Sequence, residues 1–128
     1  MWIAMVVDCS NTAKLVMRII KYYVEYKVKG KRYRVVFIDS KTVREFVKRL
    51  NCKRKPKSLS KITSKITHAL ACIAVRYGGD FAIVNRELWI DLPIRAISKA
   101  SKQELISVIY ECTKKKTWQE LRKAKKVL

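Results

Sequence analysis

Most side chains in this sequence that could bind a ligand are cations, and the densest group of them leads into a helix. A basic loop at 53–57 precedes three residues spaced i, i+4 and i+7, which fall on one side of a helix. The helix dipole favours anions at the N-terminus, and phosphates recur along a nucleic acid. We therefore predict phosphate binding by Lys53, Arg54, Lys55, Lys57, Lys61, Lys65 and His68. The alternative is a solvated surface without a ligand.

Two further groups of cations are candidates for the same role. One surrounds the tip of a predicted hairpin, where a basic ribbon could lie in a groove of a duplex or protect a sheet edge from pairing. Its members are Lys29, Lys31, Arg32 and Arg34. The other lies near the C-terminus and comprises Lys114, Lys115, Lys116, Arg122, Lys123 and Lys126. Few bulky apolar residues accompany it, which favours nucleic acid over a membrane surface.

Carboxylates suggest only one enzyme, a metal-dependent nuclease. Such enzymes need clustered acids to hold cations, and the candidates are Asp8 and Asp39, each at the end of an apolar, β-rich run. The two would meet only if those strands were adjacent and parallel. The preferred interpretation is that each caps the helix that follows it. We therefore expect a protein that is not an enzyme and has no cofactor or metal.

The net charge favours the same binding function. The chain has 128 residues, with 30 Lys and Arg against 10 Asp and Glu, and a formal charge of +20. Charge of this size opposes compaction, and a polyanion relieves it. The cations gather in residues 31–57 and 113–126, on either side of a nearly balanced middle. This segregation favours a binding surface over a general effect on solubility.

The four cysteines, Cys9, Cys52, Cys72 and Cys112, lack the spacing of a zinc site. We expect them to be chiefly small buried hydrophobes. The low Asn, Gln and Gly content resembles that of proteins from hyperthermophiles, in which intracellular disulfides form, so one or two bridges stay open as an alternative.

Nothing in the sequence predicts a membrane span or a secretion signal. No run approaches the roughly 18 consecutive apolar residues that cross a bilayer. The apolar run 1–7 is short and has no basic flank before it. We expect a cytoplasmic protein that associates with the nucleoid or the ribosome, and a homodimer stays open.

The first half of the chain predicts a buried strand at 1–7, a helix, a hairpin and a second helix. Residues 8–11 supply an N-cap, and the apolar stripe of the first helix runs to Tyr23. Alternation over 23–38 around Gly30 predicts the hairpin; the alternative extends the first helix to Tyr26 and leaves only the second strand. Asp39 and Ser40 cap a helix that ends at Asn51, before the 53–57 loop.

The second half predicts a long helix from Ser58 to about Tyr77, with Lys61, Lys65, His68, Cys72 and Arg76 on its polar side. A second hairpin follows at 81–84 and 88–92, and a capping box at 101–104 opens another helix. A second capping box at 117–120 predicts a terminal helix. We expect one basic α+β domain at 1–112, with two β-hairpins packed on amphipathic helices, and a basic helix or appendage at 113–128.

This order of elements resembles two known architectures. One is the half-unit of the LAGLIDADG homing endonucleases, whose acidic motif would fall at 19–23, where the sequence reads Ile-Ile-Lys-Tyr-Tyr without an acid. The other is a winged helix, in which 40–51 and 58–77 would be the helical pair and 81–92 the wing. A wing with Asp80, Glu87 and Asp91 is acidic for a phosphate contact.

The function predicted from the sequence is non-catalytic binding of nucleic acid through phosphates. Duplex DNA is favoured, which implies an architectural or regulatory protein. The first alternative is an RNA-binding protein of the ribosome or another ribonucleoprotein. The second is the nuclease that would use Asp8 and Asp39.

Overall fold

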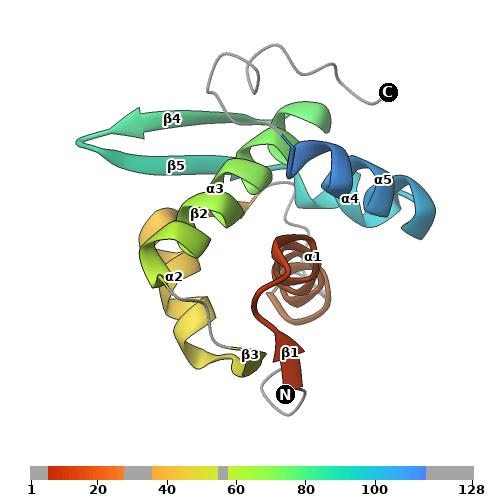
Figure 1. Ribbon diagram of the computed structural model, residues 1–128. Helices are drawn as coiled ribbons and strands as arrows, with labels where there is room; N and C mark the ends of the chain where they lie inside the picture. The colour runs from red at the N-terminus through yellow and green to blue at the C-terminus, as the bar shows by residue number, and fades with distance from the viewer. Residues whose placement is uncertain (1–5, 28–35, 55–57, 115–128) are drawn as a thin grey trace.

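The chain folds as an α+β protein, as predicted, and the computed structural model describes residues 6–27, 36–54 and 58–114 (Figure 1). In chain order the elements are β1 (Val6–Asp8), α1 (Thr12–Tyr22), the π-helix η2 (Tyr23–Lys27), β2 (Val36–Asp39), α2 (Ser40–Arg49), β3 (Asn51–Arg54), α3 (Leu59–Arg76), β4 (Asp80–Val84), β5 (Glu87–Leu92), α4 (Ile94–Lys99) and α5 (Lys102–Cys112). In the described part of the chain, no helix is long and apolar enough to cross a membrane.

Helix α3 lies at the centre of the fold, with α1, α2, α5, β4 and β5 packed around it. It begins where the Ser58 side chain accepts a hydrogen bond from the Lys61 N–H, as the sequence predicts. Ile66, Leu70 and Ile73 are fully buried along it. It ends at Arg76, and the chain then passes through Gly78 and Gly79, where a Cβ on Gly79 would clash with the Asp91 carbonyl oxygen. Only glycine fits there, so the chain turns directly into β4.

The larger sheet is antiparallel, with strand order β2-β5-β4. Ile38, Ile90 and Phe81 are aligned across its three strands and are buried on the face toward α3. The β4–β5 hairpin turns through Asn85 and Arg86, whose φ angles are 52° and 64°. Two positive φ values in a two-residue loop match the right-handed twist of a hairpin. The predicted second hairpin is confirmed.

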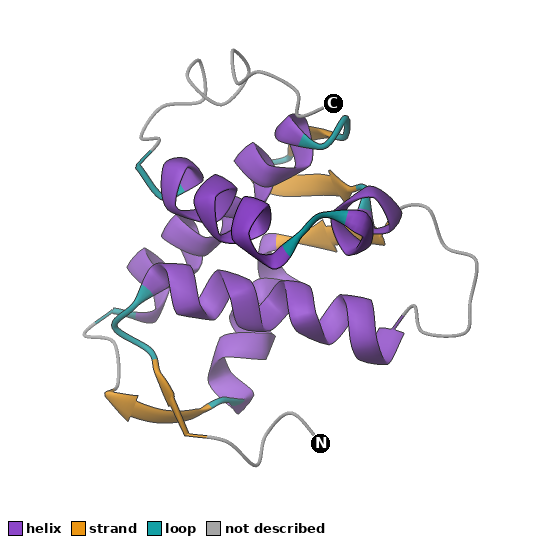
Figure 2. Cartoon of the chain, turned by 90° about the vertical axis from the view of Figure 1, so that its right-hand side faces the viewer, coloured by secondary structure: helices purple, strands orange, loops and turns teal. Residues whose placement is uncertain are grey.

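A second, two-stranded sheet lies at the other end of the molecule, with the helices between the two sheets (Figures 1 and 2). Here β1 and β3 pair in parallel, with Val7 opposite Cys52. The prediction of a loop at 53–57 is therefore wrong for Lys53 and Arg54, because their backbone belongs to β3. The pairing joins segments more than 40 residues apart, and nothing in the local sequence reveals it.

The prediction of a first hairpin over 23–38 is also wrong. Tyr23–Lys27 continues α1 as a π-helix, and β2 pairs with β5 rather than with a strand next to it in sequence. This is the alternative in which the first helix extends to Tyr26. The described residues therefore do not reproduce the helix–hairpin order of a LAGLIDADG half-unit.

Several local predictions are confirmed by the caps. The Asn11 and Asp39 side chains accept from the backbone N–H groups of Lys14 and Thr42 at 3.1 and 2.8 Å. The Ser101 hydroxyl accepts from the Glu104 N–H at 3.1 Å, as the capping box predicts. Helix α4 was not predicted, and the strand predicted at 1–7 is described only from Val6. The predicted terminal helix lies outside the described residues.

All four cysteines form disulfides, which is the alternative that the sequence left open rather than the preferred expectation of small buried hydrophobes. Cys9–Cys52 fastens the end of β1 to β3, and Cys72–Cys112 fastens α3 to α5, with Cα–Cα distances of 5.4 and 5.5 Å. Cys9, Cys72 and Cys112 are fully buried as well. The bridges tie together segments that are distant in the sequence of a highly charged chain.

Removing these bridges should destabilise the fold. Each joins residues about 40 positions apart, and the loop-entropy relation gives about 4 kcal/mol for such a loop. We expect the double variant Cys72→Ala/Cys112→Ala to lose about 2–4 kcal/mol of unfolding free energy in guanidinium titrations. Thiol titration of the unfolded, unreduced wild type should detect no free thiol; four reactive thiols would contradict the pairing.

Candidate nucleic-acid interface

Helix α3 leaves only the N-terminal part of its polar side in solvent. Lys61 and Lys65 are exposed on successive turns, and His68 is half-buried one turn further on. Beyond His68 the polar side is covered, because Cys72 is bonded to Cys112 of α5 and Arg76 forms an ion pair with Glu111. The solvent-exposed part of the predicted polar side therefore ends at His68 and does not reach Cys72 or Arg76.

His68 is held in one ring orientation. Its Nδ1 lies 2.9 Å from the carbonyl oxygen of Ser64, one turn earlier in α3. A carbonyl oxygen only accepts, so Nδ1 carries the proton and donates it. In the neutral ring Nε2 is then the acceptor, whereas in the charged ring it becomes a second donor.

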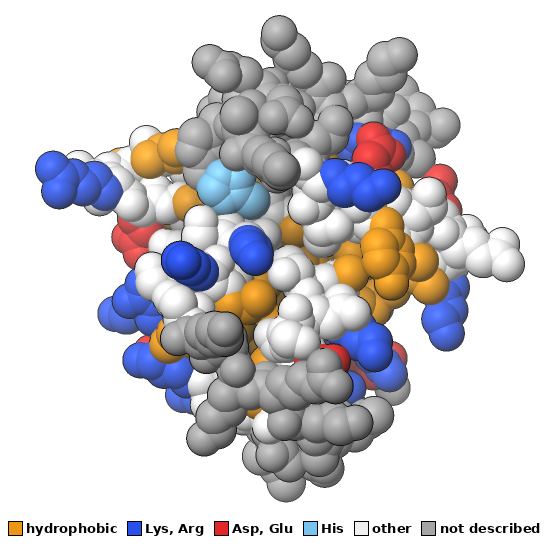
Figure 3. Space-filling model, in the orientation of Figure 1, with side chains coloured by type: hydrophobic (Ala, Val, Ile, Leu, Met, Phe, Trp, Pro, Cys, Tyr) orange, Lys and Arg blue, Asp and Glu red, His pale blue; other side chains and the backbone are white. Residues whose placement is uncertain are grey.

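Helix α2 adds a second basic surface beside α3. Lys41, Arg44, Lys48 and Arg49 are exposed on it, and Glu45 is the acid among them, 3.6 Å from the Lys48 ammonium nitrogen. The sequence analysis did not select these residues, although the spacing of Lys41, Arg44 and Lys48 is that of one helix face. Basic side chains are seen over α2 and α3 and at the tip of the β4–β5 hairpin (Figure 3). That tip carries the exposed Arg86, which was also missed.

A small cavity of about 320 Å³ lies where η2 meets α2. Tyr22, Tyr23 and Phe46 supply its aromatic wall, and Lys41 and Arg49 its cations. Burial raises the pKa of Tyr23 to about 12, and the nearby Tyr22 and Asp39 add to the effect. The phenol therefore stays protonated at neutral pH and keeps its hydrogen to donate.

Acidic side chains gather on the face of the larger sheet that points away from α3. Side chains alternate along β5, so Glu87, Trp89 and Asp91 share this face while Leu88 and Ile90 are buried on the other. In register, Asp39 lies opposite Trp89, and Asp80 lies opposite Asp91. Asp80, Glu87 and Asp91 thus lie on the outer face of the sheet, whereas Asp39 also caps α2 and Glu45 lies among the cations of α2.

The structure brings only some of the predicted site residues together. Lys61, Lys65 and His68 lie side by side on α3, and Lys114 is exposed just after α5. The backbone of Lys53 and Arg54 is in β3, and their side chains are not described. The remaining predicted positions lie outside the described residues: Lys29, Lys31, Arg32, Arg34, Lys55, Lys57, Lys115, Lys116, Arg122, Lys123 and Lys126.

An open cavity of about 750 Å³ adjoins the basic face of α3. Lys65 and His68 line it on one side, and Asp8 and the start of α1 line it on another. Tyr110, on the last turn of α5, completes it. The sequence analysis treated Asp8 and His68 separately, because the fold alone brings β1, α3 and α5 together.

The described residues do not have the geometry that the nuclease alternative requires. Asp8 ends β1 in the small sheet and Asp39 ends β2 in the large one, so the two strands are not neighbours. Among the described residues, no group of three His, Cys, Asp or Glu side chains is placed to hold a metal ion. Asp39 caps α2, as the preferred interpretation predicted. The same interpretation is wrong for Asp8, because Asn11 caps α1 and the Asp8 carboxylate accepts from Ser10 instead.

Comparisons with known proteins give no relative from which a function could be transferred. No protein-family model, no curated protein and no solved structure matches this chain with significant similarity.

Proposed function

We propose that this protein binds nucleic acid through the surface formed by α2, the N-terminal part of α3 and the tip of the β4–β5 hairpin. The observation that carries the proposal is the charge on α2 and α3. Their exposed charged side chains are six cations, Lys41, Arg44, Lys48, Arg49, Lys61 and Lys65, and one acid, Glu45. A polyanionic backbone is the ligand that such a surface attracts most strongly.

The order of elements supports duplex DNA as the preferred partner. Helix α1, strand β2, helices α2 and α3 and the hairpin β4–β5 follow one another as in a winged helix, with strand order β2-β5-β4. In that resemblance α3 is the helix that meets the groove and β4–β5 is the wing. One departure is that β3 stands between α2 and α3, where a helix-turn-helix has a turn of three or four residues.

The carboxylates of the β4–β5 hairpin would repel phosphates, but most of them lie away from the end of the hairpin that would approach DNA. Asp80 and Asp91 lie opposite each other where β4 begins and β5 ends, away from the turn. At the turn itself Arg86 is exposed and Glu87 is half-buried. The end of the wing that would approach a phosphate backbone therefore presents a cation.

Neutralising the cations of α3 should weaken binding in a salt-dependent way. We expect Lys61→Gln/Lys65→Gln to lower the affinity for a short DNA duplex roughly tenfold at low salt. The slope of log K against log salt should become less steep by about 2, because two phosphate contacts are lost. Fluorescence anisotropy over a salt series measures both quantities.

The matched control is Lys99→Gln/Lys102→Gln, which removes two exposed cations from α4 and α5 without touching α2 or α3. We expect this variant to keep the wild-type slope to within about 1. Equal losses in the two double variants would mean that only net charge matters and would contradict the proposed surface. Preference for duplex RNA over DNA would favour the ribonucleoprotein alternative.

The substitution Arg86→Gly should stabilise the fold and at the same time weaken the binding of DNA. Arg86 holds a left-handed backbone (φ 64°), which costs a residue with a Cβ about 1 kcal/mol relative to glycine. We expect the variant to unfold at higher temperature and to bind duplex DNA more weakly. A more stable variant with undiminished affinity would show that the hairpin tip does not take part in binding.

A further inference from the structure

The cavity of about 750 Å³ beside α3 has the size and the chemistry of a ligand site. Its walls come from three places in the chain: the turn between β1 and α1, the middle of α3 and the end of α5. Four of its lining residues carry aliphatic hydroxyls, Ser10, Thr12, Ser64 and Thr113. Two basic side chains lie on one side of it and an aromatic ring on another.

The basic side consists of the Lys65 ammonium group and the His68 imidazole, neighbours at i and i+3 on α3. The bond from His68 Nδ1 to Ser64 fixes the imidazole plane, so the ring need not be ordered when a ligand binds. Thr12 and Ala13, in the first turn of the 11-residue helix α1, also line the cavity and add the positive end of that helix. An anionic group would therefore be held on this side.

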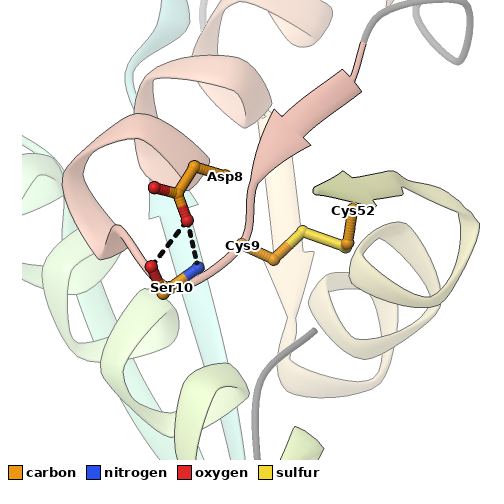
Figure 4. The surroundings of a disulfide bond; sticks show 4 residues. All are labelled: Asp8, Cys9, Ser10 and Cys52. Carbon is orange, nitrogen blue, oxygen red and sulfur yellow. Dashed lines mark hydrogen bonds between the residues drawn. A yellow bond between two sulfur atoms is a disulfide. The ribbon is translucent and has the colours of Figure 1, made fainter. Parts of the chain in front are cut away.

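The aromatic side is Tyr110, whose side chain remains 53% exposed although it belongs to a helix that packs on the core. A flat ring bound in the cavity could stack on it. Asp8 limits how such a ligand lies. Its carboxylate accepts hydrogen bonds from the N–H and the hydroxyl of Ser10 at 3.0 and 2.6 Å (Figure 4). This fixed acceptor repels phosphate and favours the hydroxyl or amino donors of a sugar or base.

We propose that this cavity binds a nucleoside phosphate, with the phosphate at the Lys65 ammonium and at Nε2 of the charged His68 ring, the base on Tyr110 and a sugar hydroxyl or base amino group at Asp8. The site extends the nucleic-acid binding proposed above and rests on it, because Lys61 and Lys65 lead along α3 from the basic surface to the cavity. The nucleotide is either a free molecule or one unpaired residue of a strand bound on α3. A paired base in a duplex cannot enter, since its edges and faces are occupied.

Titration calorimetry with adenosine monophosphate, and anisotropy with a single-stranded adenine 12-mer, distinguish the two sources. The test variant is Tyr110→Leu, which replaces an exposed ring and so spares the core. Its matched control is Phe37→Leu, a 74% exposed ring on the far face of the large sheet. We expect Tyr110→Leu to weaken binding at least about fivefold, as the loss of one base–aromatic stack predicts, and Phe37→Leu to leave it unchanged.

Weakened binding of the monophosphate in Tyr110→Leu supports a site for free nucleotides. Weakened binding of the 12-mer alone supports a site for one nucleotide of a strand. Unchanged binding of both ligands overturns the cavity proposal, and the wild-type affinity for duplex DNA then still decides the proposed function separately. Adenosine without its phosphate should bind more weakly than the monophosphate; equal affinities would also overturn the proposal, because Lys65 and His68 would have no role.

Discussion

The burial of α3 is the constraint on which the rest of this structure depends. Five other elements pack against this helix, and their packing leaves only its N-terminal turns in solvent. The disulfide from Cys72 and the ion pair from Arg76 hold α5 over the polar side of its C-terminal half. The same contacts form the cavity beside Lys65 and His68, since they bring the end of α5 near the turn that follows β1. Packing of the core thus determines which residues can meet a ligand.

Charge separation is the second property that links the fold to the proposed function. The like charges behind a formal charge of +20 repel one another and oppose folding. A buried apolar core and two disulfides, each between residues distant in sequence, oppose this repulsion. Asp80 and Asp91 lie on the face of the larger sheet that points away from α3, at the end of the β4–β5 hairpin opposite its turn.

Local features could be predicted from the sequence, and long-range ones could not. The caps at Asn11, Asp39, Ser58 and Ser101 and the second hairpin follow from residue types within a few positions of one another. The parallel pairing of β1 with β3, the pairing of β2 with β5 and both disulfides join distant segments, so no local pattern reveals them. The candidate site divides in the same way. Lys61 and Lys65 were found by helical spacing, whereas the meeting of Asp8, His68 and Tyr110 required the fold. The cations of α2 were visible in the sequence and were missed.

The measurement that tests the central claim most directly is anisotropy of the wild-type protein with matched duplex DNA, duplex RNA and single strands over a series of salt concentrations. If the six exposed cations of α2 and α3 each engage a phosphate, log K for duplex DNA should fall with log salt at a slope of about −5. If none of these nucleic acids binds more tightly than about 100 μM at physiological salt, the surface does not bind nucleic acid and the account is contradicted.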